Sequence, residues 1–341
     1  MSVIFMPNVT LASGAHFSAD TGISLVDAAA RAGFAFPYSC KTGRCSTCKC
    51  KVIEGETIAL EPETGLSELE KAEGWILACV RSAQTDLCLD ADCLEGVTLP
   101  PIKMLPSRIS SIERLANDVV RVVLRLPPTS AFEFIPGQYV DIIGPNNVRR
   151  SYSLASADAQ SKLLEFHIRA VEGGVFSDYW FSQAKPNDLL RLNGPLGTFF
   201  LRDTQDIDLI FLATGTGIAP IKAILETLSA LPAEKAPRSV KVLWGGRTLS
   251  DLYFDVGSIP GRYDYISVLS RADDTWAGAR GYVQQVLLDL GPDLKNSAVY
   301  ACGSDSMIHS AKTLLIDAGL PAHRFYSDAF VSSAAHSSDK G

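Results

Sequence analysis

The sequence predicts a multidomain protein that joins a small α+β domain, an antiparallel β-barrel and a doubly wound parallel α/β sheet. Three observations support this fold class. The 341 residues are too many for a single ordinary core. Four of the eight cysteines fall within residues 40–50, which sets that region apart. Further along, evenly spaced short strands give way after Asp206 to alternating strands and helices, the pattern of a parallel sheet.

Composition and charge narrow the class of protein. Hydrophobic residues make up 47% of the chain and charged residues 20%, as in folded globular proteins. The 38 acidic residues exceed the 31 basic ones, which argues against binding to nucleic acid or to an anionic membrane. The excess is concentrated in residues 1–97, where 13 acidic and 7 basic residues leave a net charge of −6. This acidic region is either an ordinary solvated surface or a docking face for a protein partner.

No stretch of the chain predicts export or insertion into a membrane. The start lacks the basic region and the long apolar core of a signal peptide. No apolar run reaches the ~18 residues of a membrane span. Without an export signal, the cysteines are not expected to form a disulfide framework, and the expected location is the cytoplasm.

The first domain is expected to span residues 1–96. Its expected elements are strands at residues 2–8, 14–20 and 49–55 and a helix at residues 24–34. Ser24 is suited to begin that helix, and Gly33 to end it. Three prolines then mark a linker, taken as residues 97–106.

The remaining chain is expected to form two domains, 107–204 and 205–331, followed by a disordered tail at 332–341. The barrel strands are expected at residues 119–126, 137–144, 149–156, 163–171 and 188–197, with a short helix at 175–183. The parallel sheet and its helices are expected within residues 208–228, 239–247, 263–271, 279–290 and 298–319.

The cysteine loop has a spacing that indicates a metal centre. Cys40, Cys45 and Cys48 follow the pattern C-x4-C-x2-C, which is typical of a plant-type [2Fe–2S] cluster. The natural fourth ligand is Cys79, in an apolar segment separated from Cys48 by thirty residues. Cys50 is less suitable, because it is drawn away along the strand that begins there. A zinc site is the main alternative, although it usually has two C-x2-C pairs.

Residues 149–156, "RRSYSLAS", could be an ordinary strand, but the segments that follow suggest a flavin site. Arg150 can grip a pyrophosphate with two hydrogen bonds. Tyr152 offers a flat face for a flavin ring, and Ser153 a hydroxyl beside it. The "GGVFS" stretch at 173–177 begins a helix whose N–H groups can bind phosphate.

The stretch "LATGTGIAP" lies between a buried strand and a helix. Gly215 and Gly217 would let the backbone approach a phosphate at the crevice of a parallel sheet. A tight turn without a ligand is the alternative. Cys302 ends another strand of this sheet and is expected to face the same crevice.

Together these motifs resemble the ferredoxin–NAD(P) reductase superfamily, fused to a plant-type ferredoxin domain. The resemblance covers residues 3–331 and adds "GPLGTF", "YACG" and "FYSDAF" to the motifs above. It implies a β-grasp-like ferredoxin domain, an FAD-binding barrel and an NAD-binding domain. Ser46 departs from the pattern, because glycine is frequent at its position.

The resemblance also implies roles for individual residues. FAD would be bound by Arg150, Tyr152, Ser153, Gly174, Val175, Ser177 and Phe330. The nicotinamide nucleotide would be bound by Thr214, Gly215, Thr216, Gly217 and Pro220. Residues expected near the reacting rings are Ser153, Cys302, Asp328 and Phe330.

The implied activity is electron transfer from NADH to FAD, then to the [2Fe–2S] cluster, and then to a separate acceptor protein. Two branches of the superfamily are similar. One comprises the reductase components of bacterial mono- and dioxygenases. The other comprises the reductases of CDP-4-keto-6-deoxyglucose 3-dehydrase, a pyridoxamine-phosphate-dependent sugar dehydrase of dideoxysugar biosynthesis, and several motifs resemble it more closely. A non-catalytic electron carrier or regulatory module is the alternative from another class.

Two further expectations concern the nucleotide and the assembly. Asp251 and a single arginine, Arg247, follow the second strand of the parallel sheet, near the expected ribose position. An acidic neighbour opposes a 2′-phosphate, so NADH is expected to be preferred over NADPH. The protein is expected to be a monomer.

Overall fold

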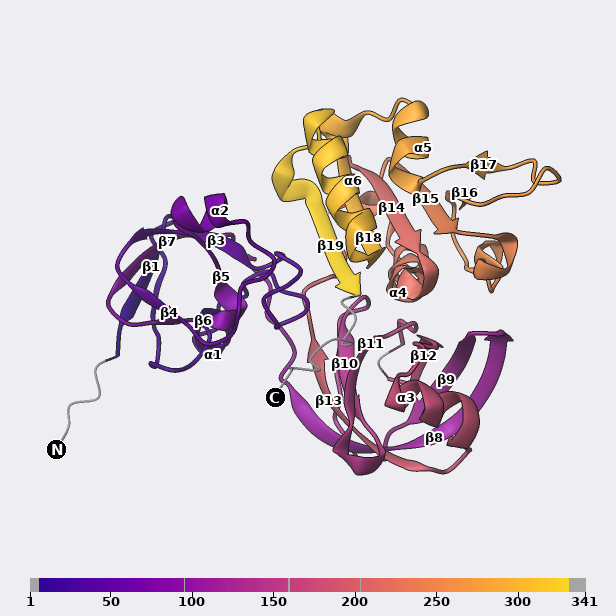
Figure 1. The fold of residues 1–341 in the computed structure, drawn as a ribbon, viewed down its shortest axis with the longest axis horizontal. Coiled ribbons are helices and arrows are strands. Elements are labelled where there is room, and N and C mark those ends of the chain that lie inside the picture. The colour runs from indigo at the N-terminus through magenta and orange to yellow at the C-terminus, as the bar shows by residue number, and fades with distance from the viewer. Residues whose placement is uncertain (1–5, 95, 159, 203, 331–341) are drawn as a thin grey trace, which may run out of the picture. The chain divides into compact units, whose positions relative to one another are not determined.

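The computed structural model describes residues 6–94, 96–158, 160–202 and 204–330. The chain divides into two units, Met1–Leu99 and Pro100–Gly341 (Figure 1). The expected disordered tail at 332–341 lies outside the described residues. Among the described residues, no helix is both long and apolar enough to cross a membrane.

The first unit is built on a five-stranded mixed sheet. Its strands, in spatial order, are β2 (His16–Ser18), β1 (Asn8–Leu11), β7 (Leu87–Asp90), β3 (Lys49–Glu54) and β5 (Trp75–Leu77). Only β1 and β7 run parallel. Helix α1 (Leu25–Arg31) begins as expected at Ser24, whose hydroxyl accepts from the Asp27 N–H at 3.1 Å. Its apolar side packs into the core of this unit.

Two features of the first unit differ from expectation. The first described strand is Asn8–Leu11 rather than residues 2–8, of which 2–5 lie outside the described residues. Residues 56–73, where no helix or strand is expected, contain β4 (Thr57–Ala59) and α2 (Glu68–Ala72), and β4 pairs with β6 (Arg81–Ala83). Helix α2 buries no side chain, so it has no hydrophobic periodicity to reveal it.

The barrel is a six-stranded sheet in which every pair is antiparallel. The order is β11 (Arg149–Ser153), β10 (Tyr139–Ile143), β13 (Leu189–Leu196), β8 (Lys103–Ala116), β9 (Val119–Arg125) and β12 (Leu163–Arg169). The end strands β11 and β12 adjoin, which closes the sheet. The expected short helix is α3 (Val175–Asp178), extended by a π-helical segment, Tyr179–Gln183.

The expected linker, residues 97–106, is shorter than predicted because β8 begins within it. It begins at Lys103 and pairs with β13 through Pro106, so the last four residues of the expected linker belong to the barrel. Proline is tolerated there because β9 pairs with β8 only from Arg108 onward, so Pro106 has a strand neighbour on one side only. Only residues 97–102 remain without helix or strand.

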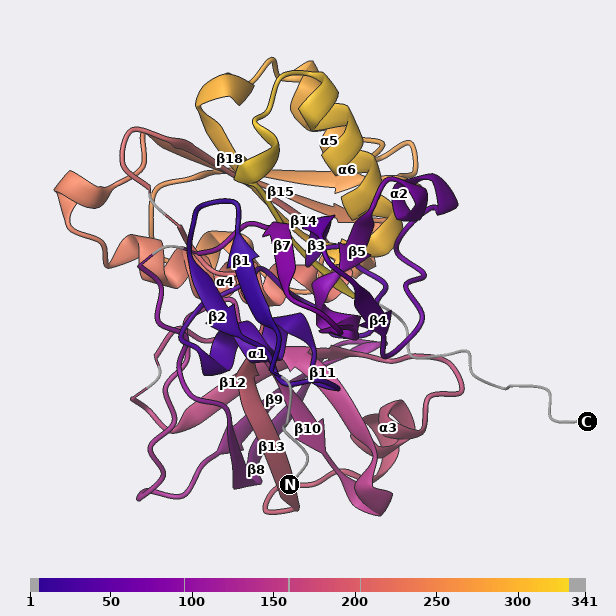
Figure 2. The same ribbon diagram turned by 90° about the vertical axis from the view of Figure 1, so that its left-hand side faces the viewer.

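The last part of the chain is a six-stranded parallel sheet. Its order is β17 (Ala279–Arg280), β16 (Asp264–Leu269), β15 (Ser239–Gly246), β14 (Asp208–Thr214), β18 (Ser297–Ser304) and β19 (Phe325–Phe330). Helix α4 (Ile218–Ser229) covers one face, and α5 (Val283–Asp289) and α6 (Asp305–Asp317) cover the other (Figure 2). The strand order reverses beside β14, and such a switch point opens a crevice at the carboxyl ends of the strands.

Candidate functional site

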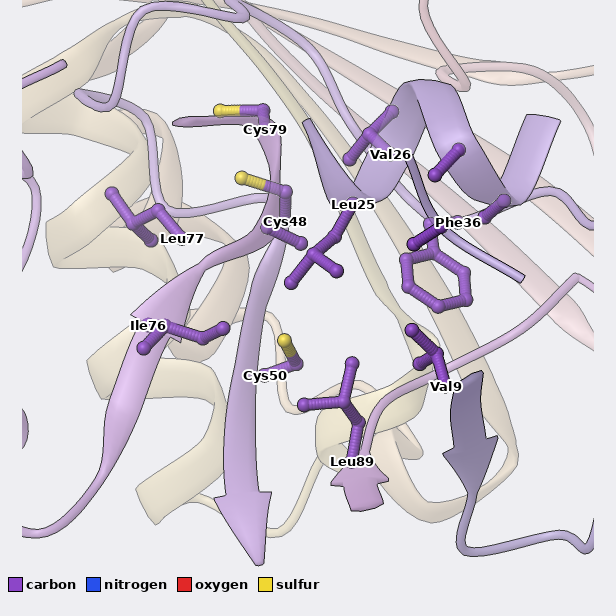
Figure 3. Close-up of a cluster of buried hydrophobic side chains, with 14 of the residues drawn as sticks. Val9, Leu25, Val26, Phe36, Cys48, Cys50, Ile76, Leu77, Cys79 and Leu89 are labelled. Atoms are coloured by element: carbon purple, nitrogen blue, oxygen red, sulfur yellow. The ribbon is translucent and has the colours of Figure 1, made fainter. Parts of the chain in front are cut away.

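The sheet of the first unit brings distant cysteines together. Cys40, Cys45 and Cys48 lie in the loop between α1 and β3, whereas Cys79 lies in a 3₁₀ turn, Ala78–Val80, after β5. Lys49, the first residue of β3, pairs with Leu77, the last residue of β5, so the cysteine loop and the Cys79 turn lie side by side. The Ala78 N–H donates to the Cys48 carbonyl at 3.1 Å. The sulfurs of Cys48 and Cys79 point to the same side (Figure 3).

The four thiols influence one another electrostatically. The pKa of Cys40 is lowered, because Cys45 and Cys79 donate hydrogen bonds to its sulfur, and the Thr42 N–H adds another at 3.4 Å. The pKa of Cys79 is raised by its hydrogen bonds to Cys40 and Cys48 and by burial. Because neighbouring thiolates repel one another, four thiolates held side by side require a compensating positive charge. An iron–sulfur cluster, which is held by thiolates, supplies that charge.

The cysteine loop also has the backbone that a cluster requires. Gly43 has φ +71°, and a Cβ there would lie 2.3 Å from the Pro62 carbonyl oxygen. Its N–H donates to the Cys79 sulfur, as cluster sulfurs need. Within the described residues, no three His, Cys, Asp or Glu side chains close on a single point, so the fit rests on this loop and on the sulfur contacts.

Cys50 lies apart from these four thiols, in the hydrophobic core of the first unit. Its side chain is 3% exposed and packs among Ile76 and Leu89 (Figure 3). Burial raises its pKa well above the usual value for a thiol. Cys50 therefore behaves as a small hydrophobic residue. None of the eight cysteines forms a disulfide, and Cys88 and Cys93 are half-buried.

The expected FAD residues lie on β11 and around α3. Arg150 and Tyr152 are two residues apart on β11, so their side chains leave the strand on the same face. The side chain of Ser153 leaves it on the opposite face. The Tyr152 hydroxyl accepts from Trp180 Nε1 at 3.1 Å, which fixes the ring against the α3 region. Arg150 donates to the Arg149 carbonyl at 2.7 Å. Nearby, a cavity of about 620 Å³ is lined by Gly174, Val175, Ser177 and neighbouring residues. Its size and its glycine-rich rim fit a dinucleotide phosphate.

The glycine loop lies at the crevice of the parallel sheet. Thr214, Gly215 and Thr216 line a cavity of about 650 Å³ at the end of β14, and Phe330 lies at its edge. Gly217 ends the 3₁₀ turn Gly215–Gly217 just before α4, and Pro220 lies in the first turn of α4. A Cβ at Gly217 would lie 2.1 Å from the Cys302 carbonyl oxygen, so only glycine allows this packing. The loop is therefore shaped for close approach of a nucleotide.

Ser153 and Asp328, 175 residues apart, meet between the barrel and the parallel sheet. The Ser153 hydroxyl donates to Asp328 Oδ2 at 3.3 Å, and both side chains are buried. Asp328 pairs with Cys302 across β18 and β19. Phe330, two residues further along β19, is 38% exposed. Asp328 thus neighbours both Ser153 and Cys302, whereas Phe330 reaches the surface near the end of the same strand.

The placement of Cys302 differs from expectation. Its side chain is fully buried in the core of the parallel sheet and does not line the crevice. Burial raises its pKa, with the neighbouring Asp328 adding to the effect. The end of β18 is covered by the glycine loop, and a strand position alone does not reveal that cover.

Arg169 is a crevice residue that the sequence pattern did not reveal. It ends β12 of the barrel, yet it lines the crevice and pairs with Asp251 (Nη2–Oδ1 3.0 Å) and Asp118 (Nε–Oδ2 3.2 Å). In the sequence, the one sign of this role was that Arg169 stands just before "AVEGG". Arg169 places a cation from the barrel within the nucleotide crevice.

Asp251 is held by its own chain. It accepts from the backbone N–H groups of Arg247 (2.8 Å) and Thr248 (3.2 Å). Burial raises its pKa, but these hydrogen bonds and Arg169 outweigh burial and hold the pKa below its usual value. Asp251 is thus an ionised partner for two arginines rather than a free carboxylate.

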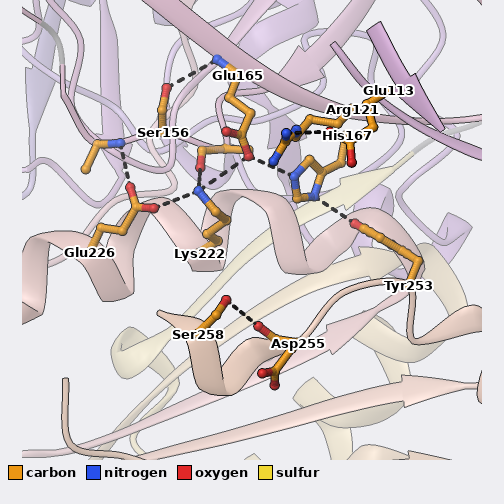
Figure 4. Close-up of polar contacts among 12 residues, drawn as sticks. Glu113, Arg121, Ser156, Glu165, His167, Lys222, Glu226, Tyr253, Asp255 and Ser258 are labelled. Atoms are coloured by element: carbon orange, nitrogen blue, oxygen red, sulfur yellow. Dashed lines mark hydrogen bonds and ion pairs between the residues drawn. The ribbon is translucent and has the colours of Figure 1, made fainter. Parts of the chain in front are cut away.

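A buried polar network joins the barrel to the parallel-sheet domain (Figure 4). His167 Nε2 contacts Glu165 Oε1 at 3.0 Å, and Nδ1 contacts the Tyr253 hydroxyl at 3.0 Å. Because a carboxylate only accepts, Nε2 carries the proton and Nδ1 accepts from Tyr253. Burial lowers the pKa of His167, although Glu165 opposes this. Tyr253 in turn packs on Trp244, whose indole N–H donates to the Gly215 carbonyl at 2.9 Å.

Comparison with known proteins assigns the three folded regions. Residues 9–84 match the 2Fe-2S iron-sulfur cluster binding domain, residues 106–201 the oxidoreductase FAD-binding domain, and residues 211–313 the oxidoreductase NAD-binding domain. One chain with these three domains is an iron–sulfur flavoprotein reductase, an NAD(P)H-dependent oxidoreductase. It belongs to the ferredoxin–NAD(P) reductase superfamily, in the branch with a fused N-terminal plant-type [2Fe–2S] domain.

The relatives are similar over nearly their whole lengths. The CDP-6-deoxy-L-threo-D-glycero-4-hexulose-3-dehydrase reductase of Yersinia pestis is 39% identical over 94% of this chain and 97% of its own. The xylene/toluene monooxygenase electron transfer component of Pseudomonas putida is 33% identical over 93% of this chain and 91% of its own. Among solved structures, the cytochrome P450 reductase of Amycolatopsis is 29% identical, with a TM-score of 0.76 over 96% of this chain and 100% of its own.

Proposed function

We propose that this reductase takes electrons from NADH and delivers them singly to a separate sugar dehydrase that acts on CDP-4-keto-6-deoxyglucose. The observation that carries the proposal is the 39% identity, over 94% of this chain, to a reductase named for such a dehydrase. Oxygenase components are less similar, at 33% identity and below among those compared.

The residues of the chain have distinct tasks in this proposal. When bound, FAD accepts a hydride and the [2Fe–2S] cluster passes on single electrons. Cys40, Cys45, Cys48 and Cys79 hold the cluster. Arg150 grips the FAD pyrophosphate, and the Gly215–Gly217 loop admits the nucleotide phosphates.

The Ser153–Asp328 pair lies where the barrel meets the parallel sheet. Ser153 Oγ donates to Asp328 Oδ2, which fixes the hydroxyl next to the end of the flavin strand. Phe330 lies at the edge of the crevice, where an aromatic ring can cover the flavin and keep water out. Cys302 packs in the core beneath the glycine loop and so helps to hold that loop in position.

The acceptor is proposed to dock on the first unit. Residues 1–97 carry a net charge of −6, which favours a fast, electrostatically steered encounter. Residues 97–102, with Pro100 and Pro101, form a short segment without helix or strand that leaves the unit some freedom to reorient. Turnover with the acceptor should therefore fall with added salt, while reduction of ferricyanide, which needs no docking, should barely change.

Reconstitution tests the proposal directly. The purified reductase is combined with NADH and either the dehydrase with its sugar nucleotide or an aromatic-ring oxygenase with its substrate. Formation of the deoxysugar product supports the dehydrase as partner. Hydroxylation alone would instead favour the oxygenase role, which the 33% identity to the monooxygenase component makes the second candidate.

A simpler measurement separates an enzyme from a passive carrier. NADH should bleach the flavin and cluster absorbance of the purified protein, whereas a non-catalytic module would show no change.

We also propose that the protein is a monomer of the cytoplasm, because eight free thiols suit a reducing compartment. Size-exclusion chromatography with light scattering checks the assembly, and cell fractionation checks the location.

A further inference from the structure

A short loop of the first unit touches both segments that carry the cluster cysteines. Residues 61–66, here called the brace loop, lie between β4 and α2. The tasks proposed above do not use this loop. Its contacts nevertheless converge on the cysteine loop from one side and on the Cys79 turn from the other.

Toward the cysteine loop, the contacts are made by Gly65. Its N–H donates to the Gly43 carbonyl at 2.9 Å, and its carbonyl accepts from the Ser46 hydroxyl at 2.5 Å. A Cβ at Gly65 would lie 2.4 Å from the Arg44 carbonyl oxygen. The two backbones are therefore packed as closely as glycine permits.

Toward the Cys79 turn, the contacts are made by the carboxylate of Glu63, which is 6% exposed. Glu63 accepts from the Leu77 N–H at 2.7 Å and from Arg81 Nε at 2.9 Å and Nη2 at 2.5 Å. Leu77 and Arg81 lie two residues before and two residues after Cys79. One carboxylate thus holds both ends of the turn that presents the fourth cysteine.

Packing alone does not explain why Glu63 and Arg81 form an ion pair at this buried place. A buried ion pair is often no more stabilising than apolar side chains of the same volume. Near an iron–sulfur cluster, however, local charge and hydrogen bonding also set the reduction potential. Glu63 and Arg81 oppose each other there, so removing either one alone leaves a charge of opposite sign.

We infer that Glu63 and Arg81 are positioning residues for the cluster, and that the brace loop holds the Cys79 turn against the cysteine loop. This inference rests on the proposed function only in taking Cys79 and the cysteine loop as cluster ligands. It also accounts for Ser46, which occupies a left-handed conformation, φ +58°, where glycine would be unstrained. Its hydroxyl bond to Gly65 is the compensating contact.

The main experiment measures the cluster potential of the purified full-length protein, without NADH or acceptor. Glu63→Gln should raise the potential, because it leaves the positive charge of Arg81, which favours the reduced cluster. Arg81→Gln should lower it, because it leaves the negative charge of Glu63. Glu68→Gln is the matched control, since that side chain is 90% exposed and its charge is screened by solvent. Both charge variants should also lose iron faster to a chelator than the control.

Shifts in the same direction for the two variants, or no shift in either, would overturn the inference. Ser46 provides a second test where Glu63→Gln does not fold. Ser46→Ala keeps the backbone strain without the bond and should lose iron faster than Ser46→Gly, so equal rates would also overturn it. A wild-type protein without any cluster would refute the proposed ligands instead, which keeps the two failures distinct.

Discussion

The cluster site and the nucleotide crevice are assembled in different ways. Three of the proposed cluster cysteines are close in sequence, and the register between β3 and β5 brings the fourth beside them. The crevice instead combines residues of the barrel and of the parallel sheet, such as Arg169 and Asp251. A local site leaves a spacing that can be recognised, whereas a site shared by two folds leaves scattered residues.

The largest expected effect falls on the local site. Cys79→Ser should abolish the cluster, because a plant-type cluster needs four thiolates. Cys50→Ser is the matched control and should retain full iron and sulfide, with a stability loss of about 1–3 kcal/mol for a poorly paired buried hydroxyl. Iron and sulfide analysis decides between them. A cluster that survives without Cys79 but not without Cys50 would reverse the assignment.

The FAD site should respond next. Arg150→Ala removes a charge-assisted contact, worth about 1.5–3 kcal/mol, and should weaken FAD binding roughly 10- to 100-fold. Arg149→Ala is the control, because its partner Asp141 lies 3.5 Å away and its side chain is 50% exposed. Flavin content after purification and titration with FAD measure the difference. Full occupancy in Arg150→Ala would make Arg150 a structural residue.

The shared site should show smaller changes in rate. Phe330→Ala and Cys302→Ala should slow hydride transfer about tenfold, a rise of about 1.4 kcal/mol in the barrier, with flavin content intact. Phe330 lies at the edge of the crevice, and Cys302 packs beneath the glycine loop. Stopped-flow reduction of the flavin measures the step. Unchanged rates in both variants would remove these residues from the site.

Nucleotide preference tests the charges of the crevice. Asp251 lies between Arg169 and Arg247, whose Nε is 3.6 Å away, so it offsets both positive charges. A 2′-phosphate then gains little from them, and NADH should exceed NADPH about tenfold or more in kcat/KM. Equal efficiency with the two nucleotides would contradict this account.

The smallest expected effect concerns the His167 network. Its folded pKa lies below 6.5, so the unfolded chain binds more protons as pH falls below about 6.5. His167 therefore adds to the free energy of unfolding above that pH. This addition is lost as the pH falls through the folded pKa, by less than about 1.4 kcal/mol per pH unit. Urea unfolding of the wild type and of His167→Gln measures this, and the variant should lose that part of the pH dependence. Identical pH profiles would show that His167 does not titrate differently on folding.

Elements with a local sequence pattern were predictable, and elements without one were not. The strands at 119–126 and 163–171 were predicted because their alternating apolar residues bury one face in the barrel. Helix α2 was missed because its folding depends on the Ser67–Glu70 capping box rather than on a buried face. The start of β8 at Lys103 was missed because prolines usually mark a break.

The candidate site was predictable only where spacing or motif is local. The sequence singled out the cysteine loop and the glycine loop for that reason. The burial of Cys302 and the reach of Arg169 into the crevice depend on how the barrel packs against the parallel sheet, which no short stretch records. The brace loop was invisible because Glu63 resembles any surface acid until its partners are placed.

The contact between Ser153 and Asp328 also sets an order of events during synthesis. Every element of the cysteine unit is complete by Leu99, whereas the hydroxyl of Ser153 must wait for a strand 175 residues later. At about 5–20 residues per second, translation needs roughly 9–35 seconds to cover that interval. A nascent chain therefore contains every residue of the first unit well before the strand that carries Asp328 is made.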